Sequence, residues 1–244
     1  MKDMPRNSSD QRENRARRLS RGWKITTVIV AALLTLWIAS EIAIPAIASS
    51  YIKREIKNKY PKAREVSVSV SAFPALRLAF KQYSRLEIKV NGITLEDINF
   101  DKIELKSNRW PDGVFTSLVS PDEIMRFFSL SYSYVLQPTI TLEHGKIQVS
   151  GRIDLGYAVA GITATGNLKA RDGRQVFFEP EDISADKVKL TAPAVESIRQ
   201  IMATNPVFVI RDDLPFTVTE VTATGGALQT RGSVNLEKAL EIKL

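Results

Sequence analysis

Residues 23–48 have the sequence WKITTVIVAALLTLWIASEIAIPAIA, which is the longest apolar run in the chain. No charged residue occurs from 25 to 40, and one acid, Glu41, follows. A helix needs about 20 mostly apolar residues to cross the roughly 30 Å hydrocarbon core of a bilayer. The run therefore predicts a membrane-spanning helix, with Trp23 and Trp37 as interfacial anchors.

The same run has a second interpretation, a cleaved signal peptide. Residues 46–48 read Ala-Ile-Ala, which has the A-x-A pattern of a cleavage site. The run is longer than a usual signal-peptide core of about 7–15 residues, and the segment before it is long for the charged leader. The sequence favours a retained anchor, and cleavage before Ser49 is the alternative.

The positive charge of the chain is concentrated at its start. The formal net charge is +7, and the first 24 residues hold eight Lys or Arg against three Asp or Glu. Lys and Arg beside a spanning segment stay on the cytoplasmic side. We therefore expect a single-pass protein of the cell membrane, with the N-terminus in the cytoplasm and the body outside. The nearly neutral body argues against a nucleic-acid partner.

These features divide the chain into three predicted parts. Residues 1–22 are polar and without apolar periodicity, so they predict a disordered basic arm in the cytoplasm. Residues 23–48 are the anchor or signal sequence, and residues 49–244 are an extracytoplasmic domain. The chain contains no cysteine, which excludes disulfides and cysteine metal sites.

Beyond the anchor, residues 50–60 have helical periodicity and stop before Pro61, and then the apolar period changes to two. Such alternation is typical of antiparallel strands with one buried face. The clearest apolar sets are Val66, Val68 and Val70, then Leu86, Ile88 and Val90, then Ile103 and Leu105, then Ile147, Val149 and Ile153. The predicted turns are Asn91-Gly92, Pro111-Asp112-Gly113, His144-Gly145, Asp172-Gly173 and Gly225-Gly226. We expect eight to ten strands.

Two helices interrupt the strands. Residues 120–123 read Ser-Pro-Asp-Glu, a capping box that predicts a helix beginning with Ser120 as N-cap. A second helix is predicted from about Pro193 to Ala203 by its apolar stripe. Strands and helices do not alternate as in a parallel sheet. The predicted fold class is α+β, a curved antiparallel sheet that wraps helices.

The sequence offers little for catalysis. The single histidine, His144, lies in a predicted turn, and no nucleophile, phosphate-loop or zinc motif occurs. An enzyme would need an acid-only site, for which Asp212-Asp213 is the candidate. We predict that the protein is not an enzyme and that it uses no cofactor or metal.

Aromatic side chains are the more informative residues. Phe73 and Phe80 flank an apolar segment after Pro74, and Phe127 and Phe128 lie in the capped helix. They have two interpretations, packing in an ordinary core or lining an apolar groove between sheet and helices. An apolar groove with few polar groups would bind acyl chains.

The order of these segments resembles the LmeA-like phospholipid-binding family of bacterial envelope proteins, from about residue 41 onward. The segments that carry the resemblance are VSVSAFP (68–74), RLEIKVNGITLEDINFDKIEL (85–105), SPDEIMRFF (120–128), GKIQVSGRI (145–153), GNLKARDGRQVFFEP (166–180) and DDLPFTVTEVTATGGALQTRG (212–232). Lys81-Gln82 stands where the family often has a glycine, which leaves the turn geometry there open. The resemblance implies a body similar in plan to tubular lipid-binding domains.

The resemblance also implies a function. We expect a membrane-anchored extracytoplasmic protein that binds phospholipid in an apolar groove and supports envelope lipid or glycolipid assembly. The expected partners are phospholipid and, through residues 23–48, the cytoplasmic membrane; no protein partner is predicted. Phe73, Phe80, Phe127 and Phe128 are the predicted lipid contacts. The alternative is a structural or interaction protein of the envelope.

Overall fold

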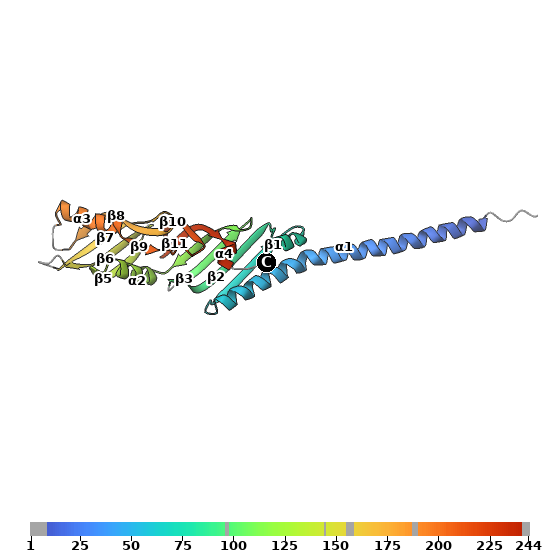
Figure 1. The fold of residues 1–244 in the computed structure, drawn as a ribbon, viewed down its shortest axis with the longest axis horizontal. Helices are drawn as coiled ribbons and strands as arrows, with labels where there is room; N and C mark the ends of the chain where they lie inside the picture. Colours follow the sequence, from blue (N-terminus) through green and yellow to red (C-terminus); the bar gives the residue numbers. More distant parts are fainter. Residues whose placement is uncertain (1–8, 96–97, 144, 155–158, 187–189, 241–244) are drawn as a thin grey trace, which may run out of the picture.

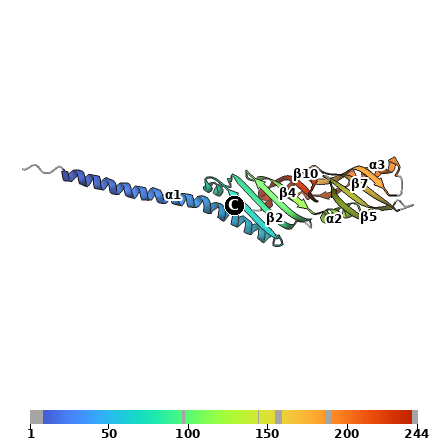
Figure 2. The same ribbon diagram turned by 180° about the vertical axis from the view of Figure 1, so that it is seen from behind.

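The computed structural model describes residues 9–95, 98–143, 145–154, 159–186 and 190–240. A long N-terminal helix, α1, projects from one end of an elongated molecule (Figure 1), and the view from behind shows the same arrangement (Figure 2). Two antiparallel sheets follow one another along the rest of the long axis. The first sheet lies beside the end of α1, and the second lies at the far end.

Helix α1 runs from Ser9 to Lys59 and includes Pro45. Its part Thr26–Lys59 is long and apolar enough to cross a membrane, and none of its most apolar window is buried within the protein. This agrees with the predicted single span. The helix predicted for 50–60 is the last part of α1 and does not form a separate element.

The helix also extends through 9–22, for which the composition predicts a disordered arm. No glycine or proline interrupts residues 9–21, so nothing in the local sequence ends a helix there. The first eight residues of the predicted arm lie outside the described residues.

The first sheet, sheet A, has six strands in the order β1-β2-β3-β4-β11-β10, and all its neighbours are antiparallel. The strands are β1 (Glu65–Ser71), β2 (Arg85–Leu95), β3 (Ile98–Ser107), β4 (Asp112–Val119), β10 (Phe216–Thr224) and β11 (Ala227–Asn235). A short 3₁₀ helix, η1 (Ala75–Phe80), joins β1 to β2, and α4 (Leu236–Leu240) follows β11.

The second sheet, sheet B, has five antiparallel strands in the order β5-β6-β7-β8-β9. The strands are β5 (Val135–Glu143), β6 (Lys146–Asp154), β7 (Val159–Arg171), β8 (Gln175–Ala185) and β9 (Pro206–Val209). Helix α2 (Pro121–Ser131) leads from sheet A to sheet B, and α3 (Ala192–Thr204) leads from β8 to β9. The α+β prediction is confirmed, and the described part of the chain has eleven strands where eight to ten were expected.

Both predicted helix starts are confirmed by their caps. The Ser120 hydroxyl accepts a hydrogen bond from the Glu123 N–H at 3.4 Å, and the Thr191 hydroxyl accepts one from the Ala194 N–H at 3.4 Å. A proline stands in the first turn of each helix, where its missing N–H costs no hydrogen bond.

The predicted turn at Asn91-Gly92 is wrong. Both residues lie inside β2, and Gly92 has a φ of +60° at a point where the pairing with β3 skips one residue on each strand. A Cβ on Gly92 would lie 2.2 Å from the Arg64 Nε atom. Glycine is therefore required by an irregularity within the strand, because a left-handed backbone and a close neighbour coincide there.

The last turns of α1 pack against sheet A. Ile52 and Ile56, one turn apart, are buried in the same core cluster as Val66 and Val70 of β1. The Val70 N–H also donates a hydrogen bond to the Ser49 hydroxyl at 3.2 Å. The helix that carries the apolar run is thus continuous with the folded body.

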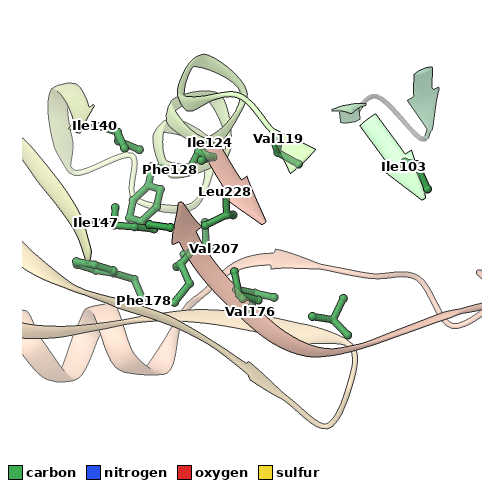
Figure 3. Packing of buried hydrophobic residues seen from close by; sticks show 14 of the residues in the cluster. Ile103, Val119, Ile124, Phe128, Ile140, Ile147, Val176, Phe178, Val207 and Leu228 are labelled. Atoms are coloured by element: carbon green, nitrogen blue, oxygen red, sulfur yellow. The ribbon is translucent and has the colours of Figure 1, made fainter. Parts of the chain in front are cut away.

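A second part of the core lies between α2 and sheet B. The Phe128 ring lies with Ile147 and Phe178 (Figure 3), and the Phe128 and Phe178 centroids are 5.5 Å apart. The neighbouring Phe177 is also buried, and the Arg171 guanidinium lies 4.4 Å from the centroid of its ring. Both adjacent phenylalanines of β8 are therefore shielded from solvent, although they point to opposite faces of the sheet.

Glu123 is a buried carboxylate that joins α2 to sheet A. It accepts hydrogen bonds from the Asn99 N–H at 3.2 Å, from the Asn99 side-chain amide at 3.1 Å and from Arg126 Nε at 3.1 Å. Burial raises the pKa of Glu123, but the hydrogen bonds from Arg126 and Asn99 outweigh it, so the net pKa is below the usual value. The ionised form therefore stabilises the fold.

We expect Glu123→Gln to lower the free energy of unfolding by about 1–3 kcal/mol at neutral pH, because hydrogen bonds to a buried charged acceptor are lost. The contribution of Glu123 is present above about pH 4.3, the unfolded pKa, and is lost as the pH falls through the lower folded pKa. Urea unfolding in detergent should therefore show the difference between the two proteins shrinking below about pH 4.

The matched control is Glu196→Gln, which removes an exposed glutamate that also pairs with an arginine three residues later, at 3.0 Å. This change should cost less than about 0.5 kcal/mol. Equal losses in the two variants would show that burial of Glu123 is not the cause.

Candidate functional site

An apolar cavity of about 400 Å³ lies where sheet A meets α2 and β9. Three groups of residues line it, from sheet A, from α2, and from β9 with the segment after it. They are Leu95, Ile98, Phe100, Ile103, Phe115, Ser117, Val119, Phe216, Val218, Leu228 and Thr230; then Ile124, Phe127, Leu130 and Ser131; then Val207, Phe208, Val209, Ile210, Arg211 and Leu214.

Sheet A supplies the floor of the cavity. Ser117 of β4 and Thr230 of β11 are directly paired, and their two buried hydroxyls hydrogen-bond to each other. The Phe115 and Phe216 rings meet edge to face nearby, with centroids 5.1 Å apart. The polar atoms of the floor are therefore satisfied internally, and what the floor offers a ligand is an apolar surface.

Helix α2 forms one wall of the cavity, because one of its faces packs on sheet B and another faces the cavity. Phe128 points into the core of sheet B, whereas Phe127, the preceding residue, lines the cavity. The Phe127 ring lies 5.9 Å from the Phe208 ring of β9, so the α2 wall and the β9 wall touch. The Ser131 hydroxyl donates a hydrogen bond to the Val207 carbonyl at 2.7 Å and fixes the same contact further along.

Tyr132 holds the start of strand β9 in place. Its hydroxyl lies 3.0 Å from the Met202 carbonyl oxygen and 2.8 Å from the Asn205 carbonyl oxygen, at the end of α3. Burial raises the pKa of Tyr132, so the phenol stays a neutral donor. The end of α2 and the start of β9 therefore keep a fixed separation.

Arg174 fixes the segment after β9. One terminal nitrogen of its guanidinium lies within 3.0 Å of three backbone carbonyl oxygens, those of Arg211, Leu214 and Phe216. The segment that leads into β10 is thereby tied to the turn between β7 and β8, and the lining residues Ile210 and Leu214 are kept on the cavity side. A guanidinium suits this task because its donors are rigid and always charged.

Arg211 lies in the lining and carries the one charge found there among the described residues. Its guanidinium makes two hydrogen bonds to the Asp213 carboxylate, at 3.1 and 2.6 Å, and both side chains are exposed. The charged group is therefore at the surface of the site, and the interior is apolar.

This arrangement suits an apolar ligand. Pockets for small molecules measure about 300–1,000 Å³ and are mostly apolar, with few polar groups. The cavity is at the small end of that range, which favours a single acyl chain over a whole phospholipid. Within the described residues no cluster of three His, Cys, Asp or Glu side chains could hold a metal ion.

The structure does not bring the four predicted phenylalanines together. Phe127 lines the cavity, and Phe128 is buried behind it in the core. Phe73 and Phe80 are exposed beside α1, on the segment between β1 and β2. Contact of these residues with lipid remains a prediction.

Sequence reasoning missed the β9 wall. The segment 206–210 reads PVFVI, an apolar run just after a predicted helix, and this was the available signal. The acid pair that follows it, Asp212-Asp213, was the predicted candidate for chemistry in this region. In the structure Asp213 pairs with Arg211, and His144 of the predicted turn lies outside the described residues.

Comparison with known proteins identifies the family of this chain. No curated protein and no solved structure matches the chain. The LmeA-like phospholipid-binding family matches residues 39–233, which include the last ten residues of the apolar run, both sheets except the last two residues of β11, and every residue that lines the cavity. The chain belongs to the LmeA-like phospholipid-binding family.

Proposed function

We propose that this protein is a membrane-anchored, extracytoplasmic phospholipid-binding protein that supports lipid or glycolipid assembly in the cell envelope. The observation that carries the proposal is the apolar cavity between sheet A, α2 and β9. Membership of a phospholipid-binding family supports a role in binding that is not enzymatic.

The cavity would take one acyl chain and leave the headgroup outside. Its floor and walls offer aliphatic and aromatic side chains whose burial against a chain stabilises by about 25 cal/mol per Å² of apolar surface. Arg211 lies in the lining with its charge exposed, so a phosphate could share its guanidinium with Asp213. The same cavity argues against a purely structural protein, because such a role does not require an apolar cavity.

We expect Val209→Asp to weaken phospholipid binding by about tenfold or more, because a carboxylate would be placed beside a bound chain. The matched control is Val159→Asp in β7, since these two valines are 55% and 57% exposed and only Val209 lines the cavity. The measurement is native mass spectrometry of lipid co-purified with the full chain, followed by exchange from labelled phospholipid vesicles.

Two results would contradict the proposal. One is a wild-type protein that carries no phospholipid and takes none from vesicles. The other is equal binding by Val209→Asp and wild type, which would move the lipid to another site. Loss of binding in both aspartate variants would point to a general effect of charge on the body.

The anchor is the second half of the proposal. The basic residues before α1's apolar part support a cytoplasmic N-terminus. Retention, as opposed to cleavage before Ser49, is supported by contacts between the body and helix residues on the N-terminal side of that bond. The Glu41 carboxylate accepts a hydrogen bond from the Ala75 N–H at 2.8 Å.

The absence of native cysteine permits a direct test of this topology. A membrane-impermeant maleimide applied to intact spheroplasts should label Val159→Cys and leave Ser9→Cys unlabelled until the membrane is opened. The reverse pattern would overturn the orientation. A mature chain that begins at Ser49 would overturn the anchor.

A further inference from the structure

The segment between β1 and β2 exposes three large apolar side chains. Phe73, Leu76 and Phe80 are 66%, 62% and 75% exposed, and we call them the η1 patch. They are held on the outer side of η1, because Ala75 and Leu78, three residues apart, face the body. Neighbouring apolar side chains left in water mark an interaction site on a soluble surface.

The backbone of this segment is firmly shaped. Lys81, at the end of η1, has a φ of +57°, and its N–H bonds back to η1 carbonyls. The sequence left the turn geometry at Lys81-Gln82 open, and in the structure Lys81 takes the left-handed conformation that commonly ends a helix. The η1 patch is therefore presented by a defined turn.

The η1 patch lies against the apolar run of α1. The Phe73 ring meets the Trp37 ring edge to face, with centroids 6.2 Å apart, and Ala75 donates to Glu41. With a rise of about 1.5 Å per residue, Trp37 lies about 6 Å nearer to the bilayer centre than Glu41. The patch is thus at the level where the span leaves the hydrocarbon.

The charges near the η1 patch fit the same location. Residues 72–82 contain Arg77 and Lys81 and no acid. Cationic side chains at a bilayer surface are attracted to anionic headgroups by about 1 kcal/mol each. Aromatic and leucine side chains with basic neighbours are the composition of an interfacial membrane contact.

We propose that the η1 patch inserts into the outer-leaflet interface of the bilayer that α1 crosses, as a second membrane contact beside the span. A single span leaves the whole molecule, α1 and body together, free to tilt in the bilayer and to rotate about the helix axis. Insertion of Phe73, Leu76 and Phe80 would fix the body in one orientation. The inference rests on the proposed membrane span and not on the cavity.

The test uses full-length single-cysteine variants that carry a nitroxide label, in vesicles of phosphatidylethanolamine and phosphatidylglycerol. Collision rates with oxygen, which concentrates in lipid, and with a water-soluble nickel complex report whether each label is in lipid or in water. Leu33→Cys is the lipid reference. Val159→Cys, on sheet B at the opposite end from α1, is the water reference (Figure 1).

The oxygen-to-nickel ratio at Phe80→Cys should approach that at Leu33→Cys and lie severalfold above that at Val159→Cys. A ratio equal to that of Val159→Cys would overturn the inference while leaving the span intact. Protection of Phe80→Cys from both reagents would also overturn it, because the patch would then be covered by protein. A Leu33→Cys label in water would overturn the span and the inference together.

Discussion

The apolar face of sheet A is longer than the elements that cover it. At one end Ile52 and Ile56 of α1 close over β1, and at the other end β10 and β11 run on past the reach of that helix. An open apolar sheet face must be covered by another layer if it is to stay out of water. The part that α1 leaves open is bordered by α2 and β9, and the space enclosed by these two walls and sheet A is the cavity. The cavity is thus a consequence of incomplete cover of sheet A.

The uncovered part of sheet A stays open only if α2 and β9 cannot close over it. Several polar contacts hold these two elements in place. Tyr132 sets the distance between α2 and the start of β9. Arg174 holds the turn from β9 to β10 through three backbone carbonyls, and Glu123 ties α2 to β3 through Asn99. Each of these groups lies behind the lining and leaves the lining itself apolar.

Sequence patterns predicted the elements better than the site. The capping box at Ser120 and the alternation in β1, β2 and β6 are local signals, and the structure has those elements where they were expected. The turn predicted at Asn91-Gly92 is wrong because a glycine suits an irregularity within a strand as well as a tight turn.

The cavity could not be predicted in the same way. Its walls come from residues 95–131 and from residues 207–230, and the space between them depends on how two sheets dock. Adjacent phenylalanines of α2 show the difficulty, since Phe127 faces the cavity and Phe128 the core. Helical periodicity assigns both to the apolar side and does not say which layer each one meets.

The position of the cavity along the molecule limits how a lipid can use it. From Trp37 to Lys59 the helix rises about 33 Å, and α1 follows the long axis of the body (Figure 1). The end of α1 lies near Asn91 of β2, where the Arg64 N–H bonds the Asn91 carbonyl at 3.0 Å, and the lining begins four residues further on, at Leu95. If α1 crosses the bilayer, a lipid in the cavity has left it entirely. Under the proposed function, a cavity of about 400 Å³ would not shield a whole phospholipid, and the exposed Leu130 and Val209 at its border would offer apolar surface to the rest of the molecule.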